Sequence, residues 1–221
     1  MERIPEPELM NETAQAIAYA QADFSEPHSR FVSLFMEKFP GMPVAGTVLD
    51  LGCGPADISR RFARAHPQSR IHGIDGSAAM LQQGRELNAH QGLSERIDLF
   101  EVCLPAAALA LPQYDVVISN SLLHHLHDPT VLWRSVKQFA APGAPVLVMD
   151  LLRPPTRQAA ETMVSQYASD EPDILRADFL ASLCAAFTQE EIAMQLHDAQ
   201  LDHLQTAIVS DRHVIIFGHM P

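Results

Sequence analysis

The stretch T-V-L-D-L-G-C-G-P-A-D-I-S-R, residues 47–60, decides the fold of this chain. An apolar run ends at Asp50, glycines follow at Gly52 and Gly54, and apolar residues then recur at helical spacing from Ile58. Glycine permits positive φ and lets a ligand approach the backbone closely, and the start of a helix presents unpaired N–H groups. The stretch therefore predicts a strand, a tight turn and a helix, the opening unit of a doubly wound nucleotide-binding sheet.

The glycine spacing argues against a dinucleotide ligand. The fingerprint G-x-G-x-x-G would place its third glycine at position 57, which is Asp57. The sequence is instead D-x-G-x-G-x-A, which resembles motif I (D/E-x-G-x-G-x-G) of the class I S-adenosylmethionine (SAM)-dependent methyltransferases, with Ala56 in place of the third glycine. The resemblance implies SAM as cofactor and S-adenosylhomocysteine (SAH) as product. It also implies that Asp50, Gly52 and Gly54 form the turn at the methionine end of SAM.

A second block, Y-D-V-V-I-S-N-S-L-L-H-H-L-H-D-P at residues 114–129, resembles the F/Y-D-x-V-x-x-x-x-x-L-H-H-x-x-D-P block of small-molecule and quinone methyltransferases. The resemblance implies that Asn120 faces the cleft beside the methyl donor. Nucleic-acid and glutamine amino-methyltransferases usually have N/D-P-P-Y at that place. Here Ser121 and two leucines follow Asn120, which counts against an amide or exocyclic amine as the methyl acceptor.

Asp75 follows a predicted strand at residues 70–74 and lies 21 residues after Gly54 (75 − 54). A doubly wound site places its ribose-binding acid at about this distance, and a carboxylate accepts hydrogen bonds from both hydroxyls of a vicinal diol. The alternative is an aspartate that caps the following helix. The resemblance implies ribose binding by Asp75, with Gly76 beside it.

The adenine contacts are less well defined by the sequence. The resemblance implies an apolar contact for Met80, although a methionine on a helix serves equally well as a core residue. Many members of the family have an acidic residue near the adenine amino group just after the third strand, predicted at residues 96–102. That position is Cys103-Leu104 here, so the contact is left to the backbone.

His124, His125 and His127 are the candidates for a catalytic base. Histidine titrates near neutral pH and can accept a proton from an O–H or N–H acceptor. Three alternatives stay open: a metal site, a satisfied core histidine, and residues that only shape the pocket. No carboxylate or cysteine set at ligand spacing accompanies the block, so we predict no metal. Similar methyltransferases sometimes use the second histidine of L-H-H as base, so the resemblance favours His125 first and His124 second.

The N-terminal region, residues 1–43, is expected to be a helical cap ahead of a methyltransferase domain at residues 44–221. Prolines among glutamates predict a loose arm at residues 1–10, and helices are predicted at residues 11–23 and 27–39. The two helices either cap the carboxyl ends of the strands or only cover the sheet. In similar enzymes a tyrosine of this region reaches the SAM carboxylate; Tyr19 has either that role or a surface-packing role, and Asp23 and His28 are further polar groups for a pocket.

Downstream of the histidines, the pattern predicts the rest of an α/β domain. Asp128 and Pro129 are expected to begin a helix, and a strand is predicted at residues 144–150. A polar, proline-bearing insertion at residues 153–173 is interpreted as a substrate lid. We expect two further helices, one at residues 178–187 and one from the capping box at Thr188 to residue 199. An antiparallel hairpin is predicted after them, at residues 201–209 and 213–217.

That hairpin matches the reversed last strand of the methyltransferase sheet, and dehydrogenases lack it. The resemblance covers roughly residues 44–150 and the hairpin. It implies a doubly wound, Rossmann-like α/β sheet of seven strands in the order 3-2-1-4-5-7-6, with six strands parallel and one antiparallel.

Composition limits the function classes. The chain has 221 residues with 15 basic and 27 acidic side chains, a formal net charge of −12, which argues against nucleic-acid binding. Three widely spaced cysteines form no CxxC pair and indicate a reducing compartment. No signal peptide and no run long enough to span or insert stably in a membrane is evident. We therefore expect a soluble, cytoplasmic protein, and a homodimer is left open.

The sequence thus predicts an enzyme that transfers a methyl group from SAM to a small-molecule acceptor. The alternatives are a quinone or lipid-intermediate methyltransferase and a SAM-binding accessory subunit without catalysis. An NAD-dependent oxidoreductase is disfavoured by Asp57 and by the terminal hairpin.

Overall fold

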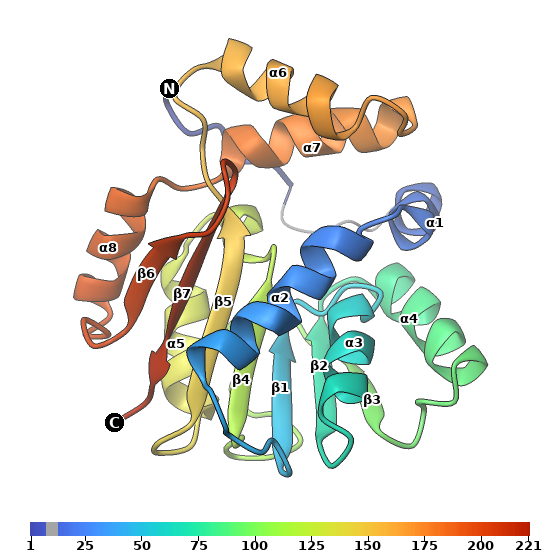
Figure 1. Ribbon diagram of the computed structural model, residues 1–221, viewed down its shortest axis with the longest axis vertical. Helices are drawn as coiled ribbons and strands as arrows, with labels where there is room; N and C mark the ends of the chain where they lie inside the picture. The colour runs from blue at the N-terminus through green and yellow to red at the C-terminus, as the bar shows by residue number, and fades with distance from the viewer. Residues whose placement is uncertain (8–12) are drawn as a thin grey trace.

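A seven-stranded sheet lies at the centre of the computed structural model, which describes residues 1–7 and 13–221 (Figure 1). The strand order is β3-β2-β1-β4-β5-β7-β6. β1 to β5 run parallel, and β7 is antiparallel to both of its neighbours. The predicted fold class, strand order and reversed strand are therefore confirmed. The strands are β1 (Thr47–Leu51), β2 (Arg70–Asp75), β3 (Ile97–Glu101), β4 (Val116–Asn120), β5 (Pro145–Leu151), β6 (Gln205–Ile208) and β7 (His213–His219).

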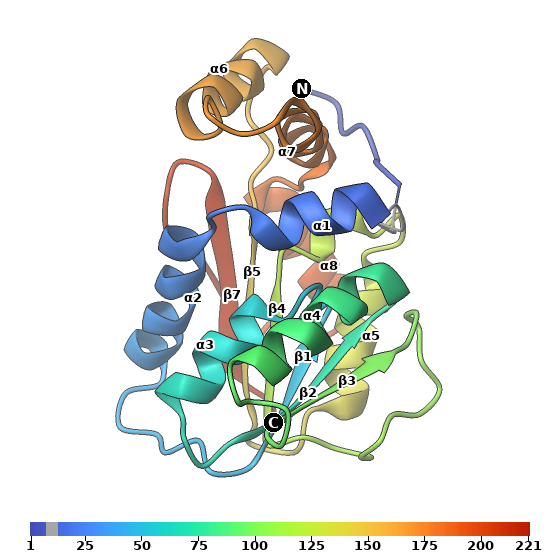
Figure 2. The ribbon, with the colours of Figure 1, turned by 90° about the vertical axis from the view of Figure 1, so that its right-hand side faces the viewer.

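Helices connect the parallel strands and cover both faces of the sheet, as crossover connections require. They are α1 (Thr13–Gln21), α2 (Ser25–Lys38), α3 (Asp57–Ala65), α4 (Ala78–His90), the 3₁₀-helix η1 (Leu123–His125), α5 (Thr130–Phe139), α6 (Arg157–Tyr167), α7 (Asp173–Ala185) and α8 (Gln189–Asp198). Figure 2 shows α2 and α3 on one side of the sheet and α5 on the other.

Successive residues of a strand point to opposite faces, and β1 shows how this builds two cores. Val48 packs in the core under α2 and α3, where it meets Phe31, Phe35 and Phe62. Leu49 packs in the core on the other face, under α5 and α8. Every one of these side chains is almost fully buried. The glycine turn is therefore anchored between two apolar layers.

Three helices lie beyond the carboxyl ends of the parallel strands. Figure 1 shows α6 and α7 beyond the end of β5, and Figure 2 shows α1 crossing above the ends of the neighbouring strands. α2, in contrast, packs along the sheet face. The division into a cap at residues 1–43 and a domain at residues 44–221 stays a prediction.

The expectation of a loose N-terminal arm is wrong for residues 1–7. Ile4 N donates to Cys184 O at 3.0 Å, and the Arg3 guanidinium donates to the backbone oxygens of His124 (2.9 Å) and Leu126 (3.0 Å). Carbonyl groups at the ends of helices have no intrahelical partner; Arg3 supplies donors to His124 O and Ala185 O, and Ile4 N supplies the donor to Cys184 O. The remainder of the predicted arm, residues 8–10, lies outside the described residues.

The predicted insertion at residues 153–173 is helical rather than irregular. Thr156 caps α6 by accepting a hydrogen bond from Ala159 N at 3.1 Å. α7 begins at Asp173, five residues before the predicted start, with Pro172 at its N-cap position. The helix expected to have Pro129 as its first residue begins at Thr130, with Asp128 Oδ1 accepting from Thr130 N at 3.0 Å. The capping box at Thr188 is confirmed.

Among the described helices, none combines the length and apolar character that crossing a membrane requires.

Candidate functional site

A cavity of about 230 Å³ opens at the carboxyl ends of β1, β2 and β4, where open parallel sheets bind ligands. It brings together all the residues that the sequence predicted for the cofactor. These are Asp50, Gly52, Gly54, Asp75, Gly76, Met80, Cys103, Leu104, Asn120 and Tyr19.

The glycine turn has the backbone conformation that its sequence anticipates. Gly52 and Gly54 have φ of +70° and +51°, and Ala56 follows with φ of 61°. A Cβ on Gly52 would lie 2.8 Å from Cδ1 of Leu122, so only glycine fits there. A Cβ on Gly54 would meet no atom within 4 Å. Gly54 therefore borders open space in the cavity, which allows a ligand to approach the backbone closely.

Asp75 is fixed by backbone amides. Its Oδ2 accepts from Gly54 N at 2.9 Å, and its Oδ1 accepts from Ser77 N at 2.8 Å. Ser77, and not Asp75, caps α4 by accepting from Met80 N, so the helix-cap alternative for Asp75 is wrong. Each carboxylate oxygen keeps a lone pair for another donor. Asp75 is thus oriented to accept from a pair of hydroxyl groups.

Asp50 lies in a different environment, deep under the turn. It is 1% exposed, and Ser59 Oγ donates to its Oδ2. Burial, with a further contribution from the Asp75 charge, raises the pKa of Asp50 to about 7, even though the Ser59 hydrogen bond opposes this shift. A buried carboxyl that ionises near neutral pH is suited to meeting a positively charged ligand group.

Three other predicted residues complete the cavity wall. Asn120 donates through Nδ2 to Ser121 Oγ at 3.1 Å, whereas its buried Oδ1 has no hydrogen-bond partner. Met80 is buried at the cavity wall. Tyr19 packs its ring 4.7 Å from that of Phe24, and burial raises the pKa of Tyr19 to about 12.

These observations fit SAM. Asn120 Oδ1 has no hydrogen-bond partner and can accept from a ligand donor. The turn at Gly54 leaves room for a ligand beside the backbone, and Asp75 can accept from ribose hydroxyls. Asp50 can face the charged amino-acid end. The individual roles of these residues remain predictions.

A second cavity of about 280 Å³ adjoins the first and lies under α6 and α7. Its apolar wall comes from β5 and α7, with Met149, Leu151, Leu175 and Phe179. Its polar groups include His124, His125, Asp23 and His28, of which His28 and His125 also line the first cavity. Tyr167, Ala168 and Glu171 of the predicted insertion also line this cavity, so the insertion contributes to a pocket.

The structure separates the two candidate bases. His124 is 2% exposed, and its Nδ1 lies 2.5 Å from Asp150 Oδ1. Although burial opposes protonation, Asp150 and the more distant Glu6 raise the pKa of His124, and His124 in turn keeps the pKa of Asp150 low. His125 is less buried, stacks 4.2 Å from the His124 ring and lines both cavities. His127 contacts the backbone oxygen of Glu6 instead.

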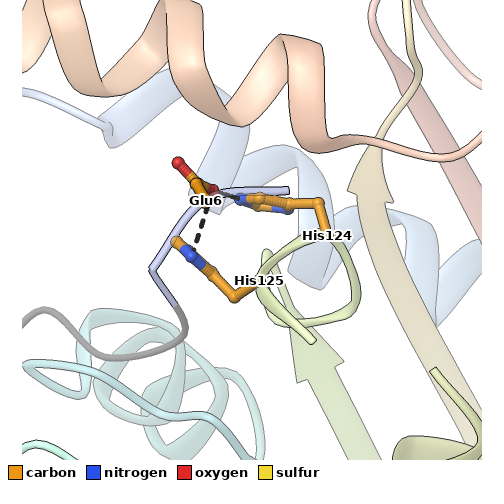
Figure 3. Close-up of side chains that lie close together, drawn as sticks. All are labelled: Glu6, His124 and His125. Carbon is orange, nitrogen blue, oxygen red and sulfur yellow. Dashed lines mark ion pairs between the residues drawn. The ribbon is translucent and has the colours of Figure 1, made fainter. Parts of the chain in front are cut away.

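The sequence did not predict three carboxylates that contact the candidate site residues: Glu6, Asp150 and Asp57. Glu6 Oε1 lies 3.1 Å from His125 Nδ1 and 3.5 Å from His124 Nε2 (Figure 3). Our argument that no carboxylate accompanies the histidines is therefore wrong, because the packed arm brings Glu6 across more than a hundred residues of sequence. Asp150 ends a predicted strand, and that position alone could have identified it as a residue near the site. No sequence pattern indicated that Asp57 would pair with His28, at 2.8 Å.

Comparison with known proteins agrees with the geometry. Residues 49–146 match the family model described as a methyltransferase domain. A trans-aconitate 2-methyltransferase from Azoarcus sp. (strain BH72) is 30% identical over 59% of this chain and 48% of its own length. A ubiquinone/menaquinone biosynthesis C-methyltransferase UbiE from Desulfotalea psychrophila is 27% identical over 73% of this chain and 63% of its own. The chain thus spans about half to two thirds of these relatives.

The fold is also shared with solved structures. The plantazolicin methyltransferase BpumL, solved in complex with a triazolic desmethylPZN analog and SAH, superimposes with a TM-score of 0.68. The match covers 94% of this chain and 91% of BpumL at 13% sequence identity, which is evidence for the fold alone. The family model and the curated relatives, together with this shared fold, support a class I SAM-dependent methyltransferase, an enzyme whose cofactor is SAM.

Proposed function

We propose that the protein transfers a methyl group from SAM in the first cavity to a small-molecule acceptor in the second. The observation that carries the proposal is that the two cavities adjoin. They share six lining residues: Tyr19, Phe24, His28, Asn120, Ser121 and His125. A donor and an acceptor held in these cavities would meet at Asn120 and His125.

Methyl transfer from a sulfonium is an in-line displacement that depends on alignment and on exclusion of water. SAM supplies the methyl group on a positively charged sulfur. In this proposal Asp75 holds the ribose, Asp50 faces the methionine end and Asn120 flanks the reacting atoms. His125 is the proposed base for an acceptor that must lose a proton. His124 is less suited, because Asp150 and Glu6 already engage its two nitrogens.

The charges around the second cavity favour a neutral or cationic acceptor. Four acidic side chains line it, namely Asp23, Glu26, Glu171 and Asp178. The guanidinium of Arg212 is engaged, since it lies 3.5 Å from the centre of the Tyr167 ring and 3.0 Å from Asp211. Burial lowers the pKa of His213 to about 4, so His213 adds no positive charge near neutral pH. A polyanion such as the trans-aconitate of one relative's name would be repelled.

A quinone or lipid-intermediate acceptor is the second candidate. The apolar wall of Met149, Leu151, Leu175 and Phe179 supports it, as does the likeness to the UbiE protein. The third candidate is an accessory subunit that binds SAM without catalysis. The cytoplasmic location, the absence of a nucleic-acid partner and a homodimer also remain predictions from the sequence.

Transfer of a labelled methyl group tests these candidates. The protein is incubated with methyl-tritiated SAM and a metabolite extract separated into anionic, neutral and cationic fractions. We expect label in the neutral or cationic fraction, and label that partitions into organic solvent identifies the quinone or lipid alternative. Label confined to the anionic fraction would contradict the proposal that the acceptor is neutral or cationic. SAH binding without transfer to any fraction would favour the accessory subunit.

The raised pKa of Asp50 leads us to expect that SAM binding depends on pH. Its carboxyl is neutral below the pKa of about 7 and charged above it, and only the charged form attracts the ammonium group at the amino-acid end of SAM. The affinity for SAM is expected to rise by up to about tenfold from pH 6 to pH 8. Calorimetry at both pH values measures the affinity. Asp50→Asn should abolish the rise, and an equal rise in that variant would assign the effect to another group.

A further inference from the structure

Glu6, His124 and His125 form a cluster beside the second cavity (Figure 3). Glu6 comes from the packed N-terminal arm, and both histidines come from η1 after β4. One ligand atom from each residue, Glu6 Oε1, His124 Nε2 and His125 Nδ1, lies within 4.8 Å of the other two. The two distances to the carboxylate oxygen are 3.5 and 3.1 Å.

These distances suit a shared metal ion. Zinc bonds to histidine nitrogen and carboxylate oxygen are about 2.0–2.2 Å long, so tetrahedral ligands lie about 3.4 Å apart. Two histidines with one carboxylate are a donor set that zinc and other first-row transition metals accept. Three protein ligands leave a coordination position free for water or a substrate atom.

The surroundings orient the ligands as metal sites require. A metal-binding histidine usually bonds a carboxylate through its other ring nitrogen, and Asp150 lies on His124 Nδ1 at 2.5 Å. Asp150 is itself fixed by Leu123 N and Leu151 N, each at 2.7 Å. Ser182 Oγ donates to the Glu6 carboxylate at 3.1 Å.

One buried atom points independently to a ligand. His125 Nδ1 is shielded from solvent and has no hydrogen-bond partner, because its 3.1 Å approach to Glu6 lacks hydrogen-bond geometry. A buried polar atom without a partner is costly. A metal ion between Glu6 and His125 would satisfy it. The Arg3 guanidinium donates its hydrogen bonds to the backbone oxygens of Ala185, His124 and Leu126, and none of these bonds goes to the Glu6 carboxylate.

We propose that Glu6, His124 and His125 bind a divalent transition-metal ion of the zinc class. In the metal-bound site the ion, and not the imidazole of His125, lowers the pKa of an acceptor hydroxyl or water. That catalytic role rests on the proposed function, whereas metal binding itself does not. The competing explanation is an ion-paired anchor for the arm, with a protonated His124 between Asp150 and Glu6.

Calorimetric titration of tag-free, chelator-treated protein with Zn²⁺ tests the site, and Co²⁺ absorption reports on its coordination geometry. We expect one ion per chain and at least tenfold weaker binding in Glu6→Gln and His125→Asn. Two matched controls should bind as the wild type does: Glu2→Gln, an exposed carboxylate on the same arm, and His197→Asn, a surface histidine paired with Asp202. Melting temperatures confirm that each variant is folded.

Two results would overturn the metal site: no Zn²⁺ binding by the wild type, or equal binding by all four variants. Retained SAH binding and methyl transfer in the chelated protein, together with no Zn²⁺ binding, would leave the proposed function intact and support the ion-paired anchor. Absence of SAH binding by the wild-type protein would instead contradict the proposed function.

Discussion

Replacing Asp75 with alanine is expected to weaken SAH binding by more than tenfold. Both carboxylate oxygens are oriented at the cavity by Gly54 N and Ser77 N, and each retains a lone pair for a ribose hydroxyl. Hydrogen bonds to charged groups contribute about 1.5–3 kcal/mol each, and a factor of ten corresponds to about 1.4 kcal/mol. Loss of even one such bond gives the expected change, which calorimetric titration measures.

The variant needs a control because Asp75 also anchors the turn. Asp98→Ala removes a partly exposed carboxylate on the neighbouring strand, which pairs with Arg70, lies 3.7 Å from His72 Nε2 and lines neither cavity. It should bind SAH as the wild type does. Melting temperatures of both variants show whether the fold is preserved. Equal SAH affinity in Asp75→Ala and Asp98→Ala would contradict the ribose role of Asp75.

Replacing Asp150 with alanine should destabilise the protein by about 3–5 kcal/mol, the usual cost of breaking a buried ion pair from one side. The change removes the partner of His124 and leaves the amides of Leu123 and Leu151 without their acceptor. Urea unfolding measures the loss of free energy. Asp128→Ala, which removes only an exposed carboxylate that accepts from Thr130 N at the start of α5, is the matched control and should cost about 1 kcal/mol.

The loss in Asp150→Ala should depend on pH. The lowered pKa of Asp150 means that its stabilisation is present above the ordinary value of 3.8 and is lost as the pH falls through the lowered pKa. The raised pKa of His124 means that its stabilisation is present below 6.5 and is lost as the pH rises through the raised pKa. The difference between wild type and variant should therefore be largest between about pH 4 and 6.5. A loss below 1 kcal/mol throughout this range would contradict the buried ion pair.

Local patterns were sufficient to predict the sheet. The apolar run before Asp50, the two glycines and the alternation in the terminal hairpin each depend on residues adjacent in sequence, and strand order followed from the family resemblance. Asp75 and Asn120 could be assigned to one cavity because parallel strands bring their carboxyl ends to the same edge. The structure places both side chains there.

Contacts between distant segments were beyond the sequence. Nothing near Glu6 indicates that it will meet His124 and His125, since that contact depends on Arg3 and Ile4 docking the arm on η1 and α7. The pairing of His28 with Asp57 joins the starts of α2 and α3 in the same way. The polar composition of residues 153–173 concealed α6, whose few buried residues include Ala160 and Val164.

Calorimetric titration of the wild-type protein with SAH tests the central claim most directly. The account predicts binding of one SAH per chain with micromolar affinity, because the cavity presents Asp75, Asn120 and the glycine turn together. No detectable heat of binding at millimolar SAH would contradict the assignment of this cavity to SAM and, with it, the proposed methyl transfer.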